Sequence, residues 1–251
     1  MMSSLFDLTG KTALVTGSSQ GIGLALAKGL AESGASVLLN GRNAERLADA
    51  SASMPGSVGL SFDVTDAEAV KQAVDSYEAN CGPIDVLVNN AGMQLRGPLE
   101  AYDPADFDRL MRTNVNSAFY VGQAVAKHMI GRGAGKIINI ASVQTALARP
   151  GIAPYTASKG AVGNLTKGMA TDWARYGLQV NAIAPGYFKT PLNEALYTDA
   201  DFSAWLETRT PAGRWGEVDE LQGACIFLAS SASSFVNGQT LFVDGGISVS
   251  L

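Results

Sequence analysis

The sequence predicts an α/β fold, in which about seven parallel strands form one doubly wound sheet with helices on both faces. Short apolar runs rich in β-branched residues alternate with longer helical segments along the whole chain. The short runs, among them ALV, VLL and KIINI, are apolar at successive positions, which is typical of strands covered on both faces. Parallel strands of this kind are joined by right-handed crossovers through helices.

The pattern places the elements in a regular order. We expect strands at residues 12–16, 36–40, 59–62, 84–89, 136–141, 179–184 and 240–243, and helices near 22–33, 43–53, 66–80, 104–131, 155–176 and 217–229. Residues 186–213 contain glycine, proline and aromatic residues but no strand. A loop of this length inside a compact domain is typically a lid or a binding element. The 251 residues, 47% of them hydrophobic, suit one domain with a large core.

Composition narrows the function classes. The net charge is −5 and no run of lysine and arginine exceeds two residues, so we expect no nucleic-acid partner and no membrane partner. No apolar run reaches the length of a membrane-spanning helix, and the first residues lack the pattern of a secretory signal. Cys81 and Cys225 lie outside any CxxC motif. They indicate free thiols in a reducing compartment, and we expect a cytoplasmic protein.

A glycine-rich turn follows the first expected strand. The run TGSSQGIG brings together Gly17, Ser19, Gln20, Gly21, Ile22 and Gly23, directly before a helix. Glycine allows a sharp turn and a close approach of a pyrophosphate, and the helix N-terminus offers free N–H groups and a positive dipole end. The run predicts a dinucleotide site, although a tight turn with helix-packing glycines would give the same pattern.

The end of the second strand concerns the choice of dinucleotide. Folds that bind NAD usually carry an acidic residue there for the adenosine ribose. This chain has Asn40, Gly41 and Arg42 instead. A guanidinium binds a 2′-phosphate in bidentate fashion, whereas a carboxylate would repel it. We therefore expect NADP(H) in preference to NAD(H), with Asn40 and Arg42 in the site; the alternative is that Arg42 only begins the next helix in solvent.

Two more strand ends add candidates for cofactor binding. Asp63 and Val64 follow the third expected strand, where Asp63 could bind the adenine amino group or cap the next helix. Asn90, Ala91 and Gly92 follow the fourth. This small, polar segment would let a flat ring and a ribose approach the backbone, but asparagine and glycine are equally typical of an ordinary turn.

The fifth strand leads to residues with a chemical use. Ser142 ends this strand, and Tyr155 and Lys159 share one face of the following helix. An adjacent ammonium and an oxidised nicotinamide both favour a tyrosinate, so we expect a lowered pKa for Tyr155. Ser142 can donate a hydrogen bond to the substrate oxygen. The Asn114 amide could hold a water that links Lys159 to solvent, or it could be a solvent-facing helix residue.

His128 is the only histidine, and it stands late in an expected helix, far from the other polar motifs. We expect it on the surface or near the helix end rather than at a reactive centre. The acidic residues are scattered along the chain, so we expect no metal site.

These motifs resemble the short-chain dehydrogenase/reductase family over essentially the whole chain. The resemblance is carried by TGSSQGIG, FDV, NNAG, TNVN, Ser142, YTASK, NAIAPG and SSFVNGQTLFVDGG. It implies one NAD(P)-binding Rossmann domain over residues 1–251 and hydride transfer between nicotinamide C4 and a secondary-alcohol carbon. It implies a catalytic tetrad and a set of further cofactor contacts. The tetrad is Asn114, Ser142, Tyr155 and Lys159, and the contacts are Tyr155, Lys159, Pro185, Gly186, Phe188 and Thr190.

The family resemblance also concerns assembly and cofactor choice. Many members are homotetramers packed through two long helices, here expected near 104–131 and 155–176. The second helix carries a stripe of small and apolar residues, which burial against the sheet would also explain. NADP-dependent relatives often have a basic residue before the second glycine of the turn. This chain has Gln20 there, so Arg42 would carry most of the selectivity.

Longer stretches, including LNGRN, GPIDVLVNNAGMQLRGPLE and RTPAGRW, resemble a bacterial subgroup that interconverts D-gluconate and 5-keto-D-gluconate. A sugar acid needs a cation for its carboxylate and polar groups for its hydroxyls. We expect Arg96 to contact the carboxylate, unless it is only a rim charge on an exposed loop. The other expected substrate contacts are Ser142, Gln144, Arg149, Tyr155 and Tyr187, with residues 186–213 as the substrate-binding lid.

Two other functions stay open at this point. The chain could reduce another ketone, such as a 3-oxoacyl thioester, a different keto-sugar acid or a hydrophobic ketone. It could also be a non-catalytic regulator that binds NADP(H), although such a protein would usually have lost a member of the tetrad.

Overall fold

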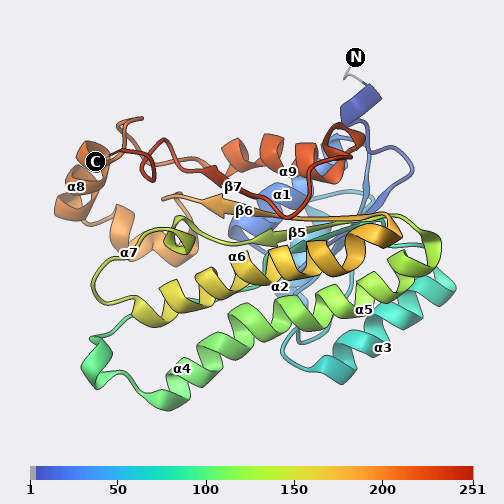
Figure 1. The fold of residues 1–251 in the computed structure, drawn as a ribbon, viewed down its shortest axis with the longest axis horizontal. Helices are drawn as coiled ribbons and strands as arrows, with labels where there is room; N and C mark the ends of the chain where they lie inside the picture. Colours follow the sequence, from blue (N-terminus) through green and yellow to red (C-terminus); the bar gives the residue numbers. More distant parts are fainter. Residues whose placement is uncertain (1–3, 251) are drawn as a thin grey trace.

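The fold is built on one seven-stranded parallel sheet. The computed structural model describes residues 4–250, whose course is shown in Figure 1. The strand order is β3-β2-β1-β4-β5-β6-β7. From the point between β1 and β4, successive strands are added outward first on one side and then on the other, as in a doubly wound sheet. The strands are β1 (Thr12–Val15), β2 (Ser36–Leu39), β3 (Val58–Gly59), β4 (Val86–Asn89), β5 (Gly135–Ile140), β6 (Leu178–Pro185) and β7 (Thr240–Val243). The predicted fold class is confirmed.

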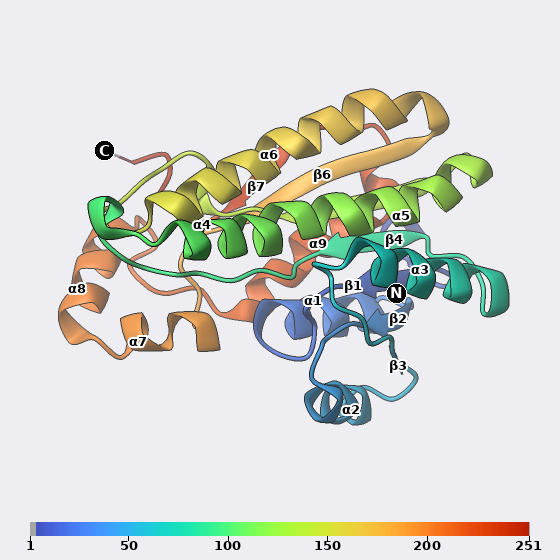
Figure 2. The ribbon, with the colours of Figure 1, turned by 90° about the horizontal axis from the view of Figure 1, so that it is seen from below.

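Helices cover both faces of the sheet (Figure 2). On one face pack α1 (Gly21–Glu32), α2 (Ala44–Ala52) and α9 (Gln222–Ala229). On the other pack α3 (Ala67–Asn80), α5 (Ser117–Arg132) and α6 (Ala153–Trp173), with α4 (Pro104–Met111) leading into α5. No helix within residues 4–250 combines the length and the apolar character needed to cross a bilayer.

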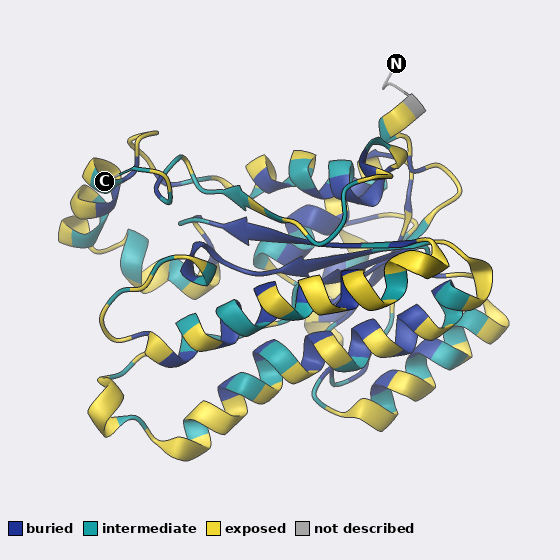
Figure 3. Cartoon of the chain, viewed as in Figure 1, coloured by how far each residue is buried: buried dark blue, intermediate teal, exposed yellow. Residues whose placement is uncertain are grey.

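The core has two main parts, one on each side of the sheet, because successive strand residues point to opposite faces. Ala13 and Val15 join the core beneath α1 and α9, whereas Leu14 joins the core beneath α3 and α5. Figure 3 shows buried residues along the strands and on the inner sides of the helices. The uninterrupted apolar runs of the sequence are thus explained by strands that are buried on both faces.

Apart from shifts of one to three residues at their ends, the observed elements differ from the predicted ones in four places. The helix expected near 217–229 begins with a 3₁₀ turn, Val218–Leu221, and becomes α-helical only in α9. The third strand is shorter than expected, and both residues of β3 are exposed because it lies at the sheet edge. The helix expected at 104–131 is interrupted by a π-helical turn, Arg112–Asn116, between α4 and α5. The segment expected as a loop contains a 3₁₀ turn (Pro191–Asn193), α7 (Glu194–Tyr197) and α8 (Ala200–Arg209).

Because the strands are parallel, their carboxyl ends all lie at the same end of the sheet. Helices α7 and α8 lie beyond the carboxyl ends of the strands (Figure 1). This arrangement leaves a crevice between the strand ends and the segment of residues 186–213, at the place where doubly wound sheets usually bind ligands.

Candidate active site

The glycine-rich turn between β1 and α1 depends on glycine at two positions. Gly17 and Gly21 have φ angles of 61° and 58°, a region that residues with side chains rarely adopt. A Cβ atom at Gly17 would lie 2.9 Å from the Cα of Ala91, so glycine also lets the turn pack against the segment after β4. Gln20 precedes α1 without a side-chain cap, which leaves the first N–H groups of the helix available to an anion.

Two asparagines at strand ends hold this turn in place. Asn40 accepts a hydrogen bond from the Gly17 N–H at 3.4 Å and donates to the carbonyls of Leu60 at 3.0 Å and Phe62 at 3.1 Å. The Asn90 amide donates to the Gly17 carbonyl at 3.0 Å. Asn40 is 1% exposed, and both atoms of its amide bind the protein. It positions the turn rather than presenting its amide to a ligand.

The end of the cleft beside α2 carries the positive charge of Arg42. The NH1 group of Arg42 lies 3.4 Å from Asp63 Oδ2, with 72% and 38% of the two side chains exposed. The N–H and the hydroxyl of Thr65 donate to Asp63 Oδ1, both at 2.8 Å. Burial raises the pKa of Asp63, but the Thr65 hydrogen bonds and the Arg42 charge outweigh burial and hold this pKa below its usual value.

The structure decides only the alternative for Asp63, which does not cap the next helix; Arg42 does not begin α2, but its side chain is 72% exposed, so its alternative place in solvent is not tested. Asn43 caps α2 by accepting a hydrogen bond from the Arg46 N–H, so Arg42 stands outside the helix and lines the crevice. Asp66, not Asp63, caps α3. The expected contacts of Arg42 with a 2′-phosphate and of Asp63 with adenine stay predictions.

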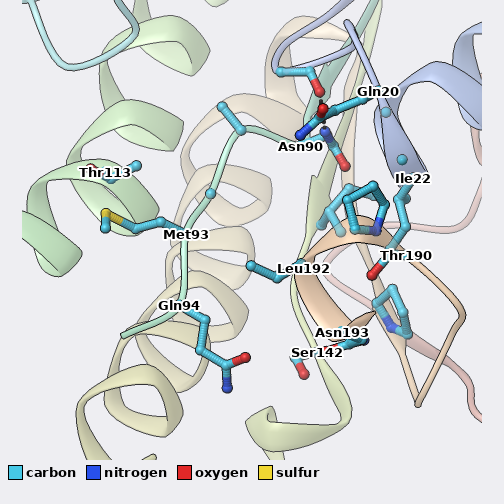
Figure 4. Close-up of a pocket in the computed structure, with 18 of the residues that line it drawn as sticks. Gln20, Ile22, Asn90, Met93, Gln94, Thr113, Ser142, Thr190, Leu192 and Asn193 are labelled. Atoms are coloured by element: carbon cyan, nitrogen blue, oxygen red, sulfur yellow. Dashed lines mark hydrogen bonds between the residues drawn. The ribbon is translucent and has the colours of Figure 1, made fainter. Parts of the chain in front are cut away.

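One continuous cleft of about 640 Å³ links this positive end to the tyrosine. In Figure 4, Gln20 and Asn90 lie at one end of the view, and Ser142 and Gln94 lie at the other. All the predicted site residues except Asn114 and Arg96 line the cleft. They are Gly17, Ser19, Gln20, Gly21, Ile22, Gly23, Asn40, Arg42, Asp63, Val64, Asn90, Ala91, Gly92, Ser142, Gln144, Arg149, Tyr155, Lys159, Pro185, Gly186, Tyr187, Phe188 and Thr190.

Tyr155 and Lys159 stand one helical turn apart near the start of α6. Lys159 is 5% exposed, and its Nζ donates to the Ile140 carbonyl at 2.7 Å and lies 5.8 Å from the centroid of the Tyr155 ring. Ser142 caps a short 3₁₀ turn, Val143–Thr145, and its Oγ accepts a hydrogen bond from the N–H of Gln144 at 3.2 Å. The phenol, the ammonium and the hydroxyl therefore come from two adjoining elements, β5 with its following turn and α6.

Burial dominates the titration of the tyrosine and the lysine. It raises the pKa of Tyr155 to about 12, against the lowering by the Ser142 hydrogen bond and the Arg96 charge. It lowers the pKa of Lys159 to about 8. In the protein without cofactor, burial thus outweighs the neighbouring groups that lower this pKa. The lowered pKa expected from the sequence includes the charge of an oxidised nicotinamide, and it stays a prediction for the protein with bound cofactor. The protonated phenol is the form that can act as an acid toward a ketone.

Asn114 lies within the π-helical turn and is 2% exposed, so the solvent-facing alternative is wrong. Its Oδ1 accepts a hydrogen bond from the Met93 N–H at 2.8 Å, and its Nδ2 donates to the Met93 carbonyl at 2.9 Å. The same Nδ2 donates to Ser158 Oγ at 3.0 Å. The amide thus joins the segment after β4 to α6, beside Lys159. A water held by this residue stays a prediction.

Two arginines interact at the other end of the cleft: Arg149 lines the cleft, whereas Arg96 lies outside its lining but acts on Tyr155 through its charge. Arg96 is exposed and donates to Gln94 Oε1 at 3.0 Å, while the Arg149 guanidinium lies 5.4 Å from the centroid of the Phe202 ring. Partial burial, and next the Arg149 charge, lower the pKa of Arg96. Within residues 4–250, neither arginine has a carboxylate partner, and the buried Nε of Arg149 has no hydrogen-bond partner.

The segment of residues 186–213 meets this end through aromatic packing. Tyr187 packs edge-on against Trp215 with ring centroids 5.8 Å apart, and it lies 5.9 Å from Phe202 of α8. The Nε2 group of Gln144 donates to the Tyr187 hydroxyl at 3.4 Å. Helix α8 begins after Asp199, whose carboxylate accepts hydrogen bonds from two N–H groups of the first turn.

The end of β6 depends on the glycine of the NAIAPG run. A Cβ atom at Gly186 would lie 2.7 Å from the Cα of Asp244, so a side chain would collide with the end of β7. Phe188 is 4% exposed and belongs to the core beneath α1, and it is also one of the residues that line the cleft. Thr190 is 7% exposed and precedes the 3₁₀ turn of the lid.

Sequence reasoning missed part of the cleft wall. Met93 and Gln94 directly follow the NNAG run, so their place after β4 could have identified them. The missed residues of the segment 186–213 carry no motif of their own. The missed lining residues are Gly41, Asn43, Arg46, Phe62, Thr65, Met93, Gln94, Thr113, Ile140, Ala141, Val143, Ile152, Pro191, Leu192, Asn193 and Leu196.

His128 and the cysteines lie outside the cleft. His128 Nε2 lies 2.7 Å from Asp75 Oδ1, which joins α5 to α3, as expected for a residue away from the reactive end. Cys81 is exposed, Cys225 is buried, and both are free thiols. In the part of the chain that the structure describes, no three His, Cys, Asp or Glu side chains cluster as metal ligands.

Comparisons with known proteins agree with this geometry. A family model described as enoyl-(acyl carrier protein) reductase matches residues 17–248. The chain is 64% identical to gluconate 5-dehydrogenase of Gluconobacter oxydans, with 98% of each chain covered, and 50% identical to 5-keto-D-gluconate 5-reductase of Escherichia coli, with 100% of each covered. It is also similar to the crystal structure of a gluconate 5-dehydrogenase from Burkholderia cenocepacia in complex with NADP and tartrate, with a TM-score of 0.96, 58% identity and 99% of each chain covered. The chain belongs to the short-chain dehydrogenase/reductase family.

Proposed function

We propose that this protein is an NADP(H)-dependent oxidoreductase that interconverts D-gluconate and 5-keto-D-gluconate. Relatives named for this chemistry are 64% and 50% identical along nearly the full chain. A similar solved structure holds NADP and tartrate, a hydroxy acid. The observation that carries the substrate class is the pair of arginines without carboxylate partners, Arg96 and Arg149, near Tyr155.

The cleft suits NADP(H) in size and in chemistry. Its volume of about 640 Å³ lies within the usual range of small-molecule sites, about 300–1,000 Å³. The glycine turn and the uncapped N-terminus of α1 would hold the pyrophosphate. Arg42 would bind the 2′-phosphate, with Arg46 beside it. When bound, NADP(H) supplies the hydride donor or acceptor.

The residues at the other end of the cleft would bind the substrate oxygen and transfer its proton. The hydroxyl of Ser142 would donate a hydrogen bond to the ketone oxygen and orient it. The phenol of Tyr155, which burial keeps protonated, would give its proton to that oxygen during reduction and take it back during oxidation. Lys159 would favour the tyrosinate by its charge and would contact the cofactor ribose, while Asn114 would hold the α6 end in place.

The two arginines favour an acidic substrate. Their positive charges act on each other, because the charge of Arg149 contributes to lowering the pKa of Arg96. No acidic side chain within residues 4–250 forms an ion pair with either of them, so a substrate carboxylate would relieve this repulsion. A 3-oxoacyl thioester or a neutral ketone offers no carboxylate near its carbonyl.

A spectrophotometric panel tests the proposal. NADPH oxidation should be fastest with 5-keto-D-gluconate and much slower with 2-keto-D-gluconate, acetoacetyl thioester and neutral ketones. Tyr155→Phe should lower kcat by about 10²- to 10⁴-fold while the Kd for NADPH stays nearly unchanged. Arg96→Met and Arg149→Met should impair acidic substrates more than neutral ketones. Retained turnover in Tyr155→Phe would reject the proton-transfer role, and equal losses for both substrate classes would reject the carboxylate role.

We also infer a homotetramer located in the cytoplasm. Phe107 of α4 and Phe119 of α5 are 38% and 40% exposed, and Ala157 and Gly168 of α6 are exposed as well, which supports packing of a second copy on this face. Two free thiols suit a reducing compartment. Light scattering after size exclusion should give four times the chain mass of 26.0 kDa, and Phe119→Glu should give a smaller species.

A further inference from the structure

The Gln144 amide is an unusual group in this cleft. Gln144 is 6% exposed, and its Oε1 is buried without a hydrogen-bond partner in the described chain. The amide nitrogen makes one long contact, 3.4 Å to the Tyr187 hydroxyl. The backbone N–H of Gln144 binds Ser142 Oγ at 3.2 Å, which fixes the residue beside the position expected for the ketone oxygen.

A buried acceptor without a donor is costly, so such groups in folded proteins usually have a role. The amide torsion has a broad minimum, and only the long contact to Tyr187 restrains it. A small rotation can therefore turn Oε1 toward a ligand in the cleft that Gln144 lines. A hydroxyl is the natural partner, because it donates one hydrogen bond and fits beside a polarised ketone.

We propose that Gln144 accepts a hydrogen bond from a substrate hydroxyl on a carbon next to the reacting carbonyl, and thereby selects α-hydroxy ketones over ketones that lack this hydroxyl. This inference rests on the proposed ketone reduction and specifies its substrate class. A ketone without the hydroxyl leaves Oε1 unpaired in the closed site, which penalises the deoxygenated substrate. In 5-keto-D-gluconate, hydroxyl-bearing carbons flank the carbonyl on both sides.

Matched substrates and two variants test the assignment. The substrates are 5-keto-D-gluconate with its 4-deoxy and 6-deoxy analogues, and the neutral pair 3-hydroxy-2-butanone and 2-butanone. Gln144→Leu removes both the acceptor and the donor, whereas Gln144→Glu keeps an acceptor. Binding of NADPH, followed by its fluorescence, reports whether each variant is folded, and it should stay within about threefold of the wild type.

The wild type should prefer 3-hydroxy-2-butanone over 2-butanone, and 5-keto-D-gluconate over one of its two deoxy analogues, by about 10- to 100-fold in kcat/KM. Gln144→Leu should reduce this ratio to about threefold or less, while Gln144→Glu should keep most of it on the neutral pair. An unchanged ratio in Gln144→Leu, or a loss as large in Gln144→Glu, would overturn the inference. If the wild type reduces the neutral ketones but no keto-sugar acid, the proposed function fails, and the neutral pair still decides the role of Gln144.

Discussion

Replacing Arg42 with alanine tests the cofactor preference directly. The guanidinium is 72% exposed, and its closest charged partner is Asp63 at 3.4 Å. Two unit charges 4 Å apart attract by about 1 kcal/mol in bulk water and by about 4 kcal/mol near a protein surface. Because Arg42 is largely exposed, we expect about 2 kcal/mol for its contact with a 2′-phosphate, which corresponds to a roughly 30-fold change in affinity.

The assay measures kcat/KM for NADPH and for NADH at saturating 5-keto-D-gluconate and low ionic strength. Arg42→Ala should lower the value for NADPH by about 30-fold and change the value for NADH by about twofold or less, since NADH lacks the phosphate. The NADPH effect should shrink at high salt, because ions screen exposed charges. Arg109 of α4 is a matched control, 59% exposed and paired with Asp106, and Arg109→Ala should change neither value. Equal losses for both cofactors in Arg42→Ala would refute the 2′-phosphate assignment.

Two further predictions concern stability. Burial lowers the pKa of Lys159 from 10.5 to about 8, so the fold disfavours its charged form by about 3 kcal/mol below about pH 8, and this penalty fades as the pH rises toward 10.5. The lost hydrogen bond of Lys159 costs about 1 kcal/mol, so Lys159→Met should stabilise the cofactor-free protein by about 2 kcal/mol near pH 7 and by less near pH 10. Guanidinium unfolding at the two pH values measures this difference. A stabilisation that grows with pH would contradict the prediction. Gly163→Ala should cost about 1–3 kcal/mol, because its Cβ would lie 2.7 Å from Thr145 Cγ2. Gly131→Ala in α5, with no atom within 4 Å, should be neutral or stabilising by up to about 1 kcal/mol, and equal costs at both glycines would argue against the packing explanation.

Most of the fold could be predicted because its signals are local. The runs ALV and VLL are apolar at every position, KIINI is apolar at three of five, and each became a strand whose residues are mostly buried. The glycine turn was recognisable because its residues serve geometry as well as binding: Gly17 needs a positive φ and a close approach to Ala91. The same glycines, followed by a helix, placed the cofactor end of the cleft.

The rest depends on tertiary contacts that no local pattern records. The shortness of β3 follows from its place at the sheet edge. The burial that raises the pKa of Tyr155 in the protein without cofactor is one such contact effect, because the sequence shows a lysine one turn away but not how deeply the phenol is buried. Helix α8 had a usable signal, since Asp199 stands directly before ADFSAWLETR, but glycines and prolines around it indicated a loop.

The role of Asn40 illustrates the same limit. Its position at the end of β2 indicated that it would lie at the cleft, and it is one of the lining residues. Its amide nevertheless binds Gly17, Leu60 and Phe62, which lie 20 to 23 residues from Asn40 in the sequence. A strand-end asparagine can therefore organise a binding site through the protein alone.

The π-helical turn imposes a fixed length on this part of the chain. The N–H of Ser117 binds the carbonyl of Arg112, five residues back, so the segment holds one residue more than a regular helical turn. Each residue of an α-helix rotates the chain by about 100°. Losing one residue within 112–116 would let α4 and α5 fuse into a straight helix, but it would rotate Asn114 away from Met93 or turn the inner face of α5 out of the core. Length variation among related sequences should therefore be frequent in the surface connections and nearly absent in these five positions.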